Sequence, residues 1–288
     1  TQLVEEDDAE SAAILRKVII APFEQRDLLS KSLEELVRII LLYACTNTKN
    51  ITLKLLQSRL GGEKSYANMI EAWKSAGPNL KNNIKRNLES ILKLEQEQPG
   101  AVGILYNNFG ICNTGRYPET MLLAQVRQKD DITHPYGIIL YPLSDKNGAY
   151  FLEKKVFEKM FQDAQGIYHI RVTEAGSTSE IARRLVDLDT TYGEHEKISF
   201  AIVGGHGSKK RIRFGDNPIS GDINTEDLIN ASFREEQGKK SGIARTKKFF
   251  TNHPMIALIS CHVGEKGAPG EYISSLYGAT VIGPSGAV

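Results

Sequence analysis

The second half of the chain alternates short apolar runs with amphipathic segments, and this alternation constrains the fold more than any other feature. Runs rich in Ile, Val and Leu are typical of strands buried on both faces, whereas the segments between them have helical spacing. The pattern predicts an α/β fold with a mostly parallel sheet in three layers. The expected strands are 137–143, 166–173, 198–203, 255–259 and 279–283, and the expected helices are 151–164, 179–188, 225–233 and 271–277.

Two of the expected strands end in residues that carry chemistry. The third strand ends in Gly-Gly-His-Gly, with the histidine at His206, and the fourth ends in Ser-Cys-His, with the cysteine at Cys261. Reactive groups gather outside the carboxyl ends of the strands in parallel sheets. We therefore expect His206 and Cys261 to lie at the same edge.

A cysteine beside a histidine is a nucleophilic pair. The thiolate is the reactive form, and a neighbouring imidazole takes its proton or stabilises its charge. Backbone N–H groups near the cysteine can donate to a developing oxyanion. His206 lies 55 residues before Cys261, and caspases place their histidine about 50 residues upstream of the cysteine.

Two blocks of sequence resemble a known family. Ser199-Phe-Ala-Ile-Val-Gly-Gly-His-Gly-Ser and Ala257-Leu-Ile-Ser-Cys-His-Val-Gly resemble the histidine and cysteine blocks of caspase-like (clan CD) cysteine peptidases. The wording is closest to metacaspases, and it is also similar to toxin self-processing peptidases and separase. The resemblance covers residues 136–288 and implies a caspase-like three-layer sandwich.

The same resemblance implies an activity. Cys261 would attack the scissile carbonyl of a protein substrate, or of the chain itself, and form a thioester acyl-enzyme. His206 would act as general acid and base, and the backbone amides of Gly207 and Cys261 would bind the oxyanion.

The pocket for the substrate side chain departs from the family pattern. Metacaspases carry an aspartate two residues before the cysteine, and this chain has Ile259 there. If this chain prefers a basic residue before the cleaved bond, another acidic side chain has to bind that residue in the pocket. Asp145, Asp216 and Glu265 are the candidates.

A basic cluster follows the histidine and comprises Lys209, Lys210, Arg211 and Arg213. We expect a solvated hairpin here. The alternative is an anion site, because the resemblance to the toxin peptidases implies an inositol polyphosphate activator; calcium is another small activator to consider. The candidates to extend this cluster are Lys154, Lys155, Arg183, Arg184, Lys247 and Lys248.

The first part of the chain has helical periodicity. We expect a helical region over 1–100, a connector over 101–135 with a helix at 118–128, and the peptidase domain over 136–288. The helices of the first region are expected at 9–20, 30–43, 51–60, 66–75 and 79–97, where they would position substrates or restrain the site. The loop 237–248 is expected to be exposed, and is either an ordinary loop or a site of activating cleavage.

Composition limits the partners and the compartment. The net charge of +1, from 36 basic and 35 acidic residues, gives no global case for nucleic acid. No apolar run is long enough to span a membrane. The sparse cysteines Cys45, Cys112 and Cys261 indicate reduced thiols in the cytoplasm, or in a host cytoplasm for an effector. Neither CxxC nor HxxxH spacing occurs, so the sequence predicts no metal site and no bound cofactor.

Other interpretations remain open at this level. Cys261 alone is typical of a buried core residue and His206 alone of a turn. His262 is expected at a helix start or in a pocket wall. A non-catalytic caspase-like scaffold that binds a regulatory protein, and a hydrolase or acyltransferase acting on a non-peptide substrate, are the alternative functions.

Overall fold

The computed structural model describes residues 78–143, 154–214, 221–237 and 244–287. Its contacts divide the chain into two compact units, which we describe separately: one comprises 1–107, 112–123 and 146–155, and the other 108–111, 124–145 and 156–288. The helices predicted at 9–20, 30–43, 51–60 and 66–75 lie outside the described residues. None of the helices that are described is long and apolar enough to cross a bilayer.

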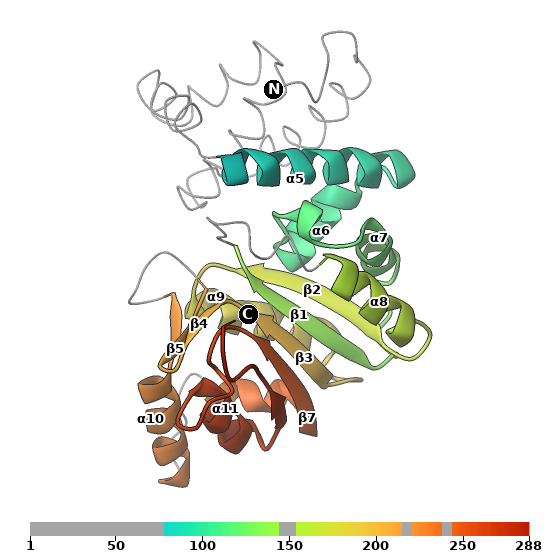
Figure 1. The fold of residues 1–288 in the computed structure, drawn as a ribbon. Helices are drawn as coiled ribbons and strands as arrows, with labels where there is room; N and C mark the ends of the chain where they lie inside the picture. Colours follow the sequence, from blue (N-terminus) through green and yellow to red (C-terminus); the bar gives the residue numbers. More distant parts are fainter. Residues whose placement is uncertain (1–77, 144–153, 215–220, 238–243, 288) are drawn as a thin grey trace, which may run out of the picture. The chain divides into compact units, whose positions relative to one another are not determined.

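The described part of the first unit is helical (Figure 1). Helix α5 spans Pro78–Glu97, in agreement with the helix predicted over 79–97. The 3-10 helix η2 spans Thr114–Arg116, and the side-chain oxygen of Asn87 accepts a hydrogen bond of 2.9 Å from Gly115 N. Helix α7 spans Glu119–Arg127, within the helix predicted at 118–128.

Helix α6 spans Ala101–Phe109, within the segment predicted as a connector. Gly103 and the two asparagines at 107–108 lower its intrinsic helix propensity, which explains why periodicity missed it. A cap at its N-terminus offsets this low propensity: the carboxylate of Glu95 accepts hydrogen bonds of 2.8 Å from Gly100 N and Val102 N. A negative charge at a helix N-terminus is favourable, because unpaired N–H groups point there.

The second unit is built on a parallel sheet. Within the described residues, five strands lie in the order β2-β1-β3-β7-β8, and every neighbouring pair is parallel (Figure 1). The predicted α/β fold with a mostly parallel sheet is confirmed. The strands are β1 (Tyr136–Pro142), β2 (His169–Ala175), β3 (Ile198–Gly204), β7 (Phe250–Ile259) and β8 (Thr280–Ile282).

Helices cover both faces of this sheet. Ile138 and Leu140 of β1 share an apolar lining with α9 (Thr178–Tyr192), α10 (Thr225–Glu236), η4 (Ala244–Phe249) and α11 (Pro269–Tyr277). Successive strand residues point to opposite faces, so Tyr141 points to the other side. There its ring meets Phe157 of α8 (Lys154–Ala164) edge to face, with centroids 5.4 Å apart.

Two side chains satisfy backbone groups at the start of α9 and at the edge of the sheet. Ser177 caps α9, where its hydroxyl accepts a hydrogen bond of 3.2 Å from Glu180 N. At the outer edge of β2, the fully buried amide of Gln125 donates to Val172 O and accepts from Val172 N, both at 2.9 Å. The side chain thereby pairs backbone groups that an edge strand leaves open.

A small antiparallel sheet follows β3. Strand β4 (His206–Ser208) pairs with β5 (Arg211–Arg213), which pairs with β6 (Asp222–Asn224). The β4–β5 pair is the hairpin expected after the histidine. The sequence prediction missed β6, and it began β7 at residue 255 rather than 250, because neither segment carries a sustained apolar run.

Candidate functional site

The two residues expected to act together follow neighbouring strands. Gly204, the last residue of β3, is in register with Ile259, the last residue of β7. Gly205 N then donates a hydrogen bond of 3.3 Å to Ile259 O. His206 and Cys261 each come two residues after this pair, so both lie at the carboxyl edge of the sheet, as the sequence predicted.

Gly207 brings the backbones of the two loops into contact. A Cβ atom placed on Gly207 would lie 2.3 Å from Cys261 O and 2.5 Å from Cys261 N. These distances are far shorter than any real Cβ contact allows, so only glycine fits here. The two residues expected to supply oxyanion donors are therefore adjacent in space.

The neighbouring glycines have packing roles of their own. A Cβ on Gly204 would meet the ring of Tyr141 at 2.4 Å, and one on Gly205 would meet the Ile212 side chain at 2.7 Å. The space beside these glycines is thus filled by the protein itself. The glycine-rich block lets the β3 end, the β4–β5 hairpin and the Cys261 loop approach one another closely.

Solvent exposure distinguishes Cys261 from a fully buried core residue. His206 is exposed and Cys261 is half-buried. Cys112 is also half-buried, and Cys45 lies outside the described residues. The Cys261 side chain, at the carboxyl edge of the sheet, is therefore partly accessible to a reagent or a substrate.

His262 adopts an uncommon conformation directly after Cys261. Its φ of 61° lies in the left-handed region, which is unfavourable for a residue with a side chain. The backbone is held by a hydrogen bond of 2.8 Å from His262 N to Gly286 O, and Gly264 N donates to Pro284 O at 2.9 Å. Backbone strain of this kind concentrates at functional sites.

Glu265 links the two loops through its carboxylate. One oxygen lies 2.5 Å from Lys209 Nζ, and the other lies 2.5 Å from His262 Nδ1. Hydrogen bonds from Lys209 and His262 lower the pKa of Glu265 below its ordinary value, and the bond from Lys209 has the larger effect. Glu265, expected as a pocket acid, is thus engaged with two residues that flank His206 and Cys261.

Replacing Glu265 with glutamine is expected to lower the melting temperature at neutral pH only slightly, because ion pairs with an exposed partner contribute little to stability. A carboxyl whose pKa is lower in the folded chain stabilises the fold above its unfolded-state value of 4.5 and loses this effect as the pH falls below it. The difference between wild type and Glu265→Gln should therefore shrink as the pH falls below 4.5 and through the lowered pKa of the folded chain. Glu194→Gln, at an exposed turn, is the matched control. A pH-independent difference would contradict the ionic link.

The basic cluster is paired with acids. Arg211 Nη1 and Arg213 Nε lie 2.9 and 3.3 Å from the two carboxylate oxygens of the buried Asp222. Lys209 contacts Glu265, and Lys210 is exposed at the hairpin turn. An anion at this hairpin would have to compete with these two carboxylates.

The additional basic residues are distributed over other elements. Lys154 Nζ lies 2.8 Å from Glu119 in the first unit. Lys247 and Lys248 precede β7, at the edge of the sheet opposite the hairpin. Arg183 and Arg184 lie on α9, and Lys155 on α8. Asp145, Asp216 and residues 238–243 of the predicted cleavage loop lie outside the described residues.

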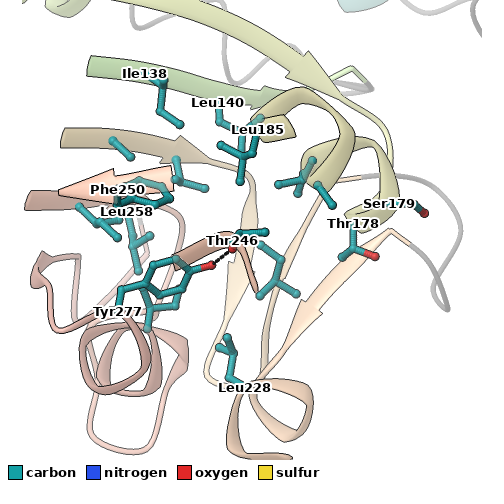
Figure 2. A pocket seen from close by; sticks show the side chains of 17 residues that line it. Ile138, Leu140, Thr178, Ser179, Leu185, Leu228, Thr246, Phe250, Leu258 and Tyr277 are labelled. Atoms are coloured by element: carbon teal, nitrogen blue, oxygen red, sulfur yellow. Dashed lines mark hydrogen bonds between the residues drawn. The ribbon is translucent and has the colours of Figure 1, made fainter. Parts of the chain in front are cut away.

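An apolar cavity of about 330 Å³ lies between the sheet and the helices on one face (Figure 2). Its lining is mainly aliphatic, and the hydroxyls of Thr246 and Tyr277 form a hydrogen bond of 2.5 Å within it. Burial raises the pKa of Tyr277. The lining contains neither His206 nor Cys261, so this cavity is separate from the candidate dyad.

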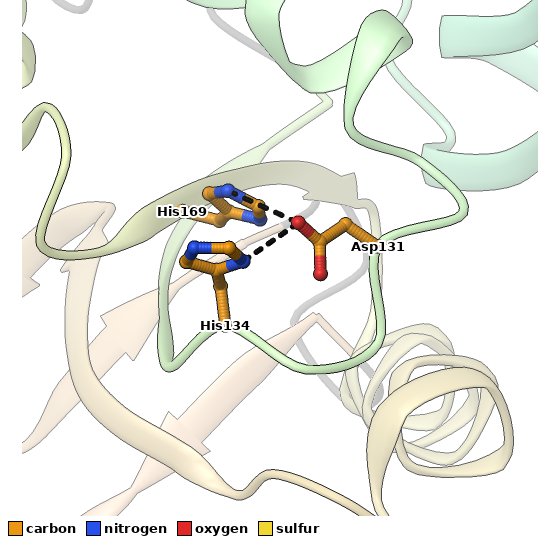
Figure 3. A group of neighbouring side chains, drawn as sticks. All are labelled: Asp131, His134 and His169. Carbon is orange, nitrogen blue, oxygen red and sulfur yellow. Dashed lines mark hydrogen bonds and ion pairs between the residues drawn. The ribbon is translucent and has the colours of Figure 1, made fainter.

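Sequence spacing missed a second polar cluster, at the opposite edge of the sheet. Asp131, His134 and His169 place one ligand atom each within 4.8 Å of one another (Figure 3). The hydrogen bond from Thr133 N has the largest effect on the pKa of Asp131, which is lowered to about 2. Burial has the largest effect in lowering the pKa of His169, and the positive charge of Arg171 lowers it further. The only sequence signal was Asp and His three residues apart, which is common at turns.

Comparison of the chain with models of known protein families, with curated proteins and with solved structures found no match. We therefore infer the function from the residues at the two edges of the sheet.

Proposed function

We propose that the chain is a cysteine endopeptidase in which Cys261 and His206 form the catalytic dyad. The observation that carries the proposal is the meeting of two distant loops at one edge of the sheet, where the Gly207 backbone contacts the Cys261 backbone. The caspase-like reading of the fold remains part of this proposal. The half-buried thiol and the strained His262 beside it favour a reactive site over a core cysteine.

The proposed chemistry proceeds in two steps. His206 takes the thiol proton, and the Cys261 sulfur attacks the peptide carbonyl carbon. The N–H groups of Gly207 and Cys261 stabilise the oxyanion, and the amine leaves with the proton from His206. Water, deprotonated by His206, then hydrolyses the thioester and regenerates the thiol.

A fluorogenic peptide library that varies the residue before the cleaved bond tests the proposal directly. We expect turnover of at least one member, together with stoichiometric labelling of Cys261 by a thiol-directed peptide inhibitor. Mass spectrometry locates the label, and the half-buried Cys112 is the internal control. An inert chain, or equal labelling of Cys112 and Cys261, would reject the peptidase in favour of a scaffold. Thiol labelling by a non-peptide acyl donor alone would indicate an acyltransferase.

The dyad has its own test. His206→Ala is expected to lower the rate of Cys261 alkylation at neutral pH and to reduce kcat/KM by roughly 10²–10⁴-fold, because the general base is lost. His253→Ala, at an exposed position on β7, should leave both unchanged. An alkylation rate that is the same in His206→Ala and wild type would remove His206 from the mechanism.

A further inference from the structure

The Asp131, His134 and His169 cluster differs from the candidate dyad in place and in chemistry. Asp131 and His134 lie before β1, and His169 is the first residue of β2, so the cluster sits at the amino edge of the sheet. Strands of seven residues separate this edge from the carboxyl edge by roughly 20 Å. Nothing in the proposed peptidase chemistry uses these three residues.

The side chains converge on one point. Figure 3 shows both imidazole rings directed toward the same oxygen of Asp131. That oxygen lies 2.7 Å from His134 Nδ1 and 3.7 Å from His169 Nε2. The two rings stack with centroids 4.6 Å apart and an interplanar angle of 21°. Donor atoms around a tetrahedral metal ion are about 3.3 Å apart, and the three ligand atoms here lie within 4.8 Å of one another. To share one ion, these atoms would have to move closer together by up to about 1.5 Å, and the stacked rings would have to tilt toward it.

The carboxylate is already oriented by the chain. Thr133 N and Thr133 Oγ1 each donate a hydrogen bond of 3.0 Å to the other oxygen of Asp131. One oxygen therefore remains directed at the imidazoles. The His169 side chain is only 10% exposed, whereas that of His134 is 53% exposed and gives an entry path from solvent.

We propose that Asp131, His134 and His169 bind a first-row divalent transition-metal ion. Two imidazoles and one carboxylate are a donor set typical of Zn²⁺ and Fe²⁺, and the open side leaves positions for water or a substrate. The Oδ2 atom of Asp131, Nδ1 of His134 and Nε2 of His169 are the ligand atoms.

The position of Arg171 is expected to weaken metal binding at this site. Its Nη2 lies 3.5 Å from His169 Nδ1 and donates a hydrogen bond of 3.1 Å to the backbone oxygen of Asp131. Binding through Nε2 places the proton on Nδ1, so the contact with Arg171 must open. The buried guanidinium charge also opposes a cation. We therefore expect weaker binding than at structural zinc sites with four protein ligands.

Zinc titration of the chelator-treated chain, in competition with a fluorescent zinc indicator, tests the proposal. We expect one equivalent of Zn²⁺ to bind, with at least tenfold weaker binding in His134→Ala and in Asp131→Asn. His134 is half-exposed, so its truncation leaves the core intact, and far-UV circular dichroism checks the fold of each variant. Cobalt supplies a second readout, since its visible absorption should appear in wild type and disappear in His134→Ala.

Two control variants distinguish this site from other zinc-binding groups. His195→Ala, at an exposed turn, and Cys261→Ser, at the candidate dyad, should both keep the equivalent of zinc. Absence of saturable zinc binding by the wild-type chain would overturn the proposal and leave the cluster as a hydrogen-bonded turn. Binding that is lost in Cys261→Ser and kept in His134→Ala would overturn it as well.

Discussion

Replacing Cys261 with alanine is expected to abolish peptide turnover, with kcat falling by roughly 10⁴-fold or more. Removal of a nucleophile eliminates the covalent route and leaves only what binding and oxyanion stabilisation contribute. Because the thiol is half-buried at the edge of the sheet, the loss of one sulfur atom should change the melting temperature little. Steady-state kinetics and a thermal scan on the same preparation measure the two effects.

Cys112→Ala is the matched control, since Cys112 is also half-buried and contains the same thiol. We expect this variant to retain full activity. Residual activity in Cys261→Ala equal to that of wild type would assign the turnover to another residue. An equal loss in both cysteine variants would point to a general effect of thiol removal rather than to catalysis.

Gly207→Ala is expected to have the second-largest effect, on both stability and turnover. The added Cβ would lie 2.3 Å from Cys261 O and 2.5 Å from Cys261 N, and both are backbone atoms that cannot rotate away. The two loops must separate to admit it. A displacement of about 1 Å between reacting groups can reduce a rate by about 10²-fold, and we expect at least this loss together with a lower melting temperature.

Gly103→Ala provides the comparison, because no atom lies within 4 Å of the position that its Cβ would take. Gly103 lies inside helix α6, where alanine is the better helix former. We expect an unchanged or higher melting temperature and unchanged turnover. If Gly207→Ala behaves like Gly103→Ala, the loops are not packed as described, and the geometric basis of the dyad is lost.

The placement of His206 and Cys261 was predictable because it depends on a simple rule. Apolar runs identified β3 and β7, and parallel strands end at the same edge, so residues following each run had to share that edge. The hairpin after His206 was also predictable, since the polar turn separates two short segments. In both cases the local pattern and the global fold agree.

The pairing of charges was not predictable, because it depends on which acids approach in space. The cluster at 209–213 reads as a free basic patch in the sequence, yet Arg211 and Arg213 contact Asp222 of the next strand. Lys209 contacts Glu265, which comes from the loop after β7. The cluster of Asp131, His134 and His169 was missed for the same reason, since β1 and β2 bring together residues far apart in sequence.

The pairing of β3 with β7 also determines when the site forms during folding. The two strands are joined by the antiparallel sheet, α10 and η4, so their pairing is a long-range event whose entropic cost must be met before its contacts form. A nascent chain that ends before residue 250 contains the histidine loop and lacks the strand that carries the thiol. The loops that carry His206 and Cys261 therefore come together only after β7 has paired with β3, so a chain that has not formed this pair lacks the proposed site.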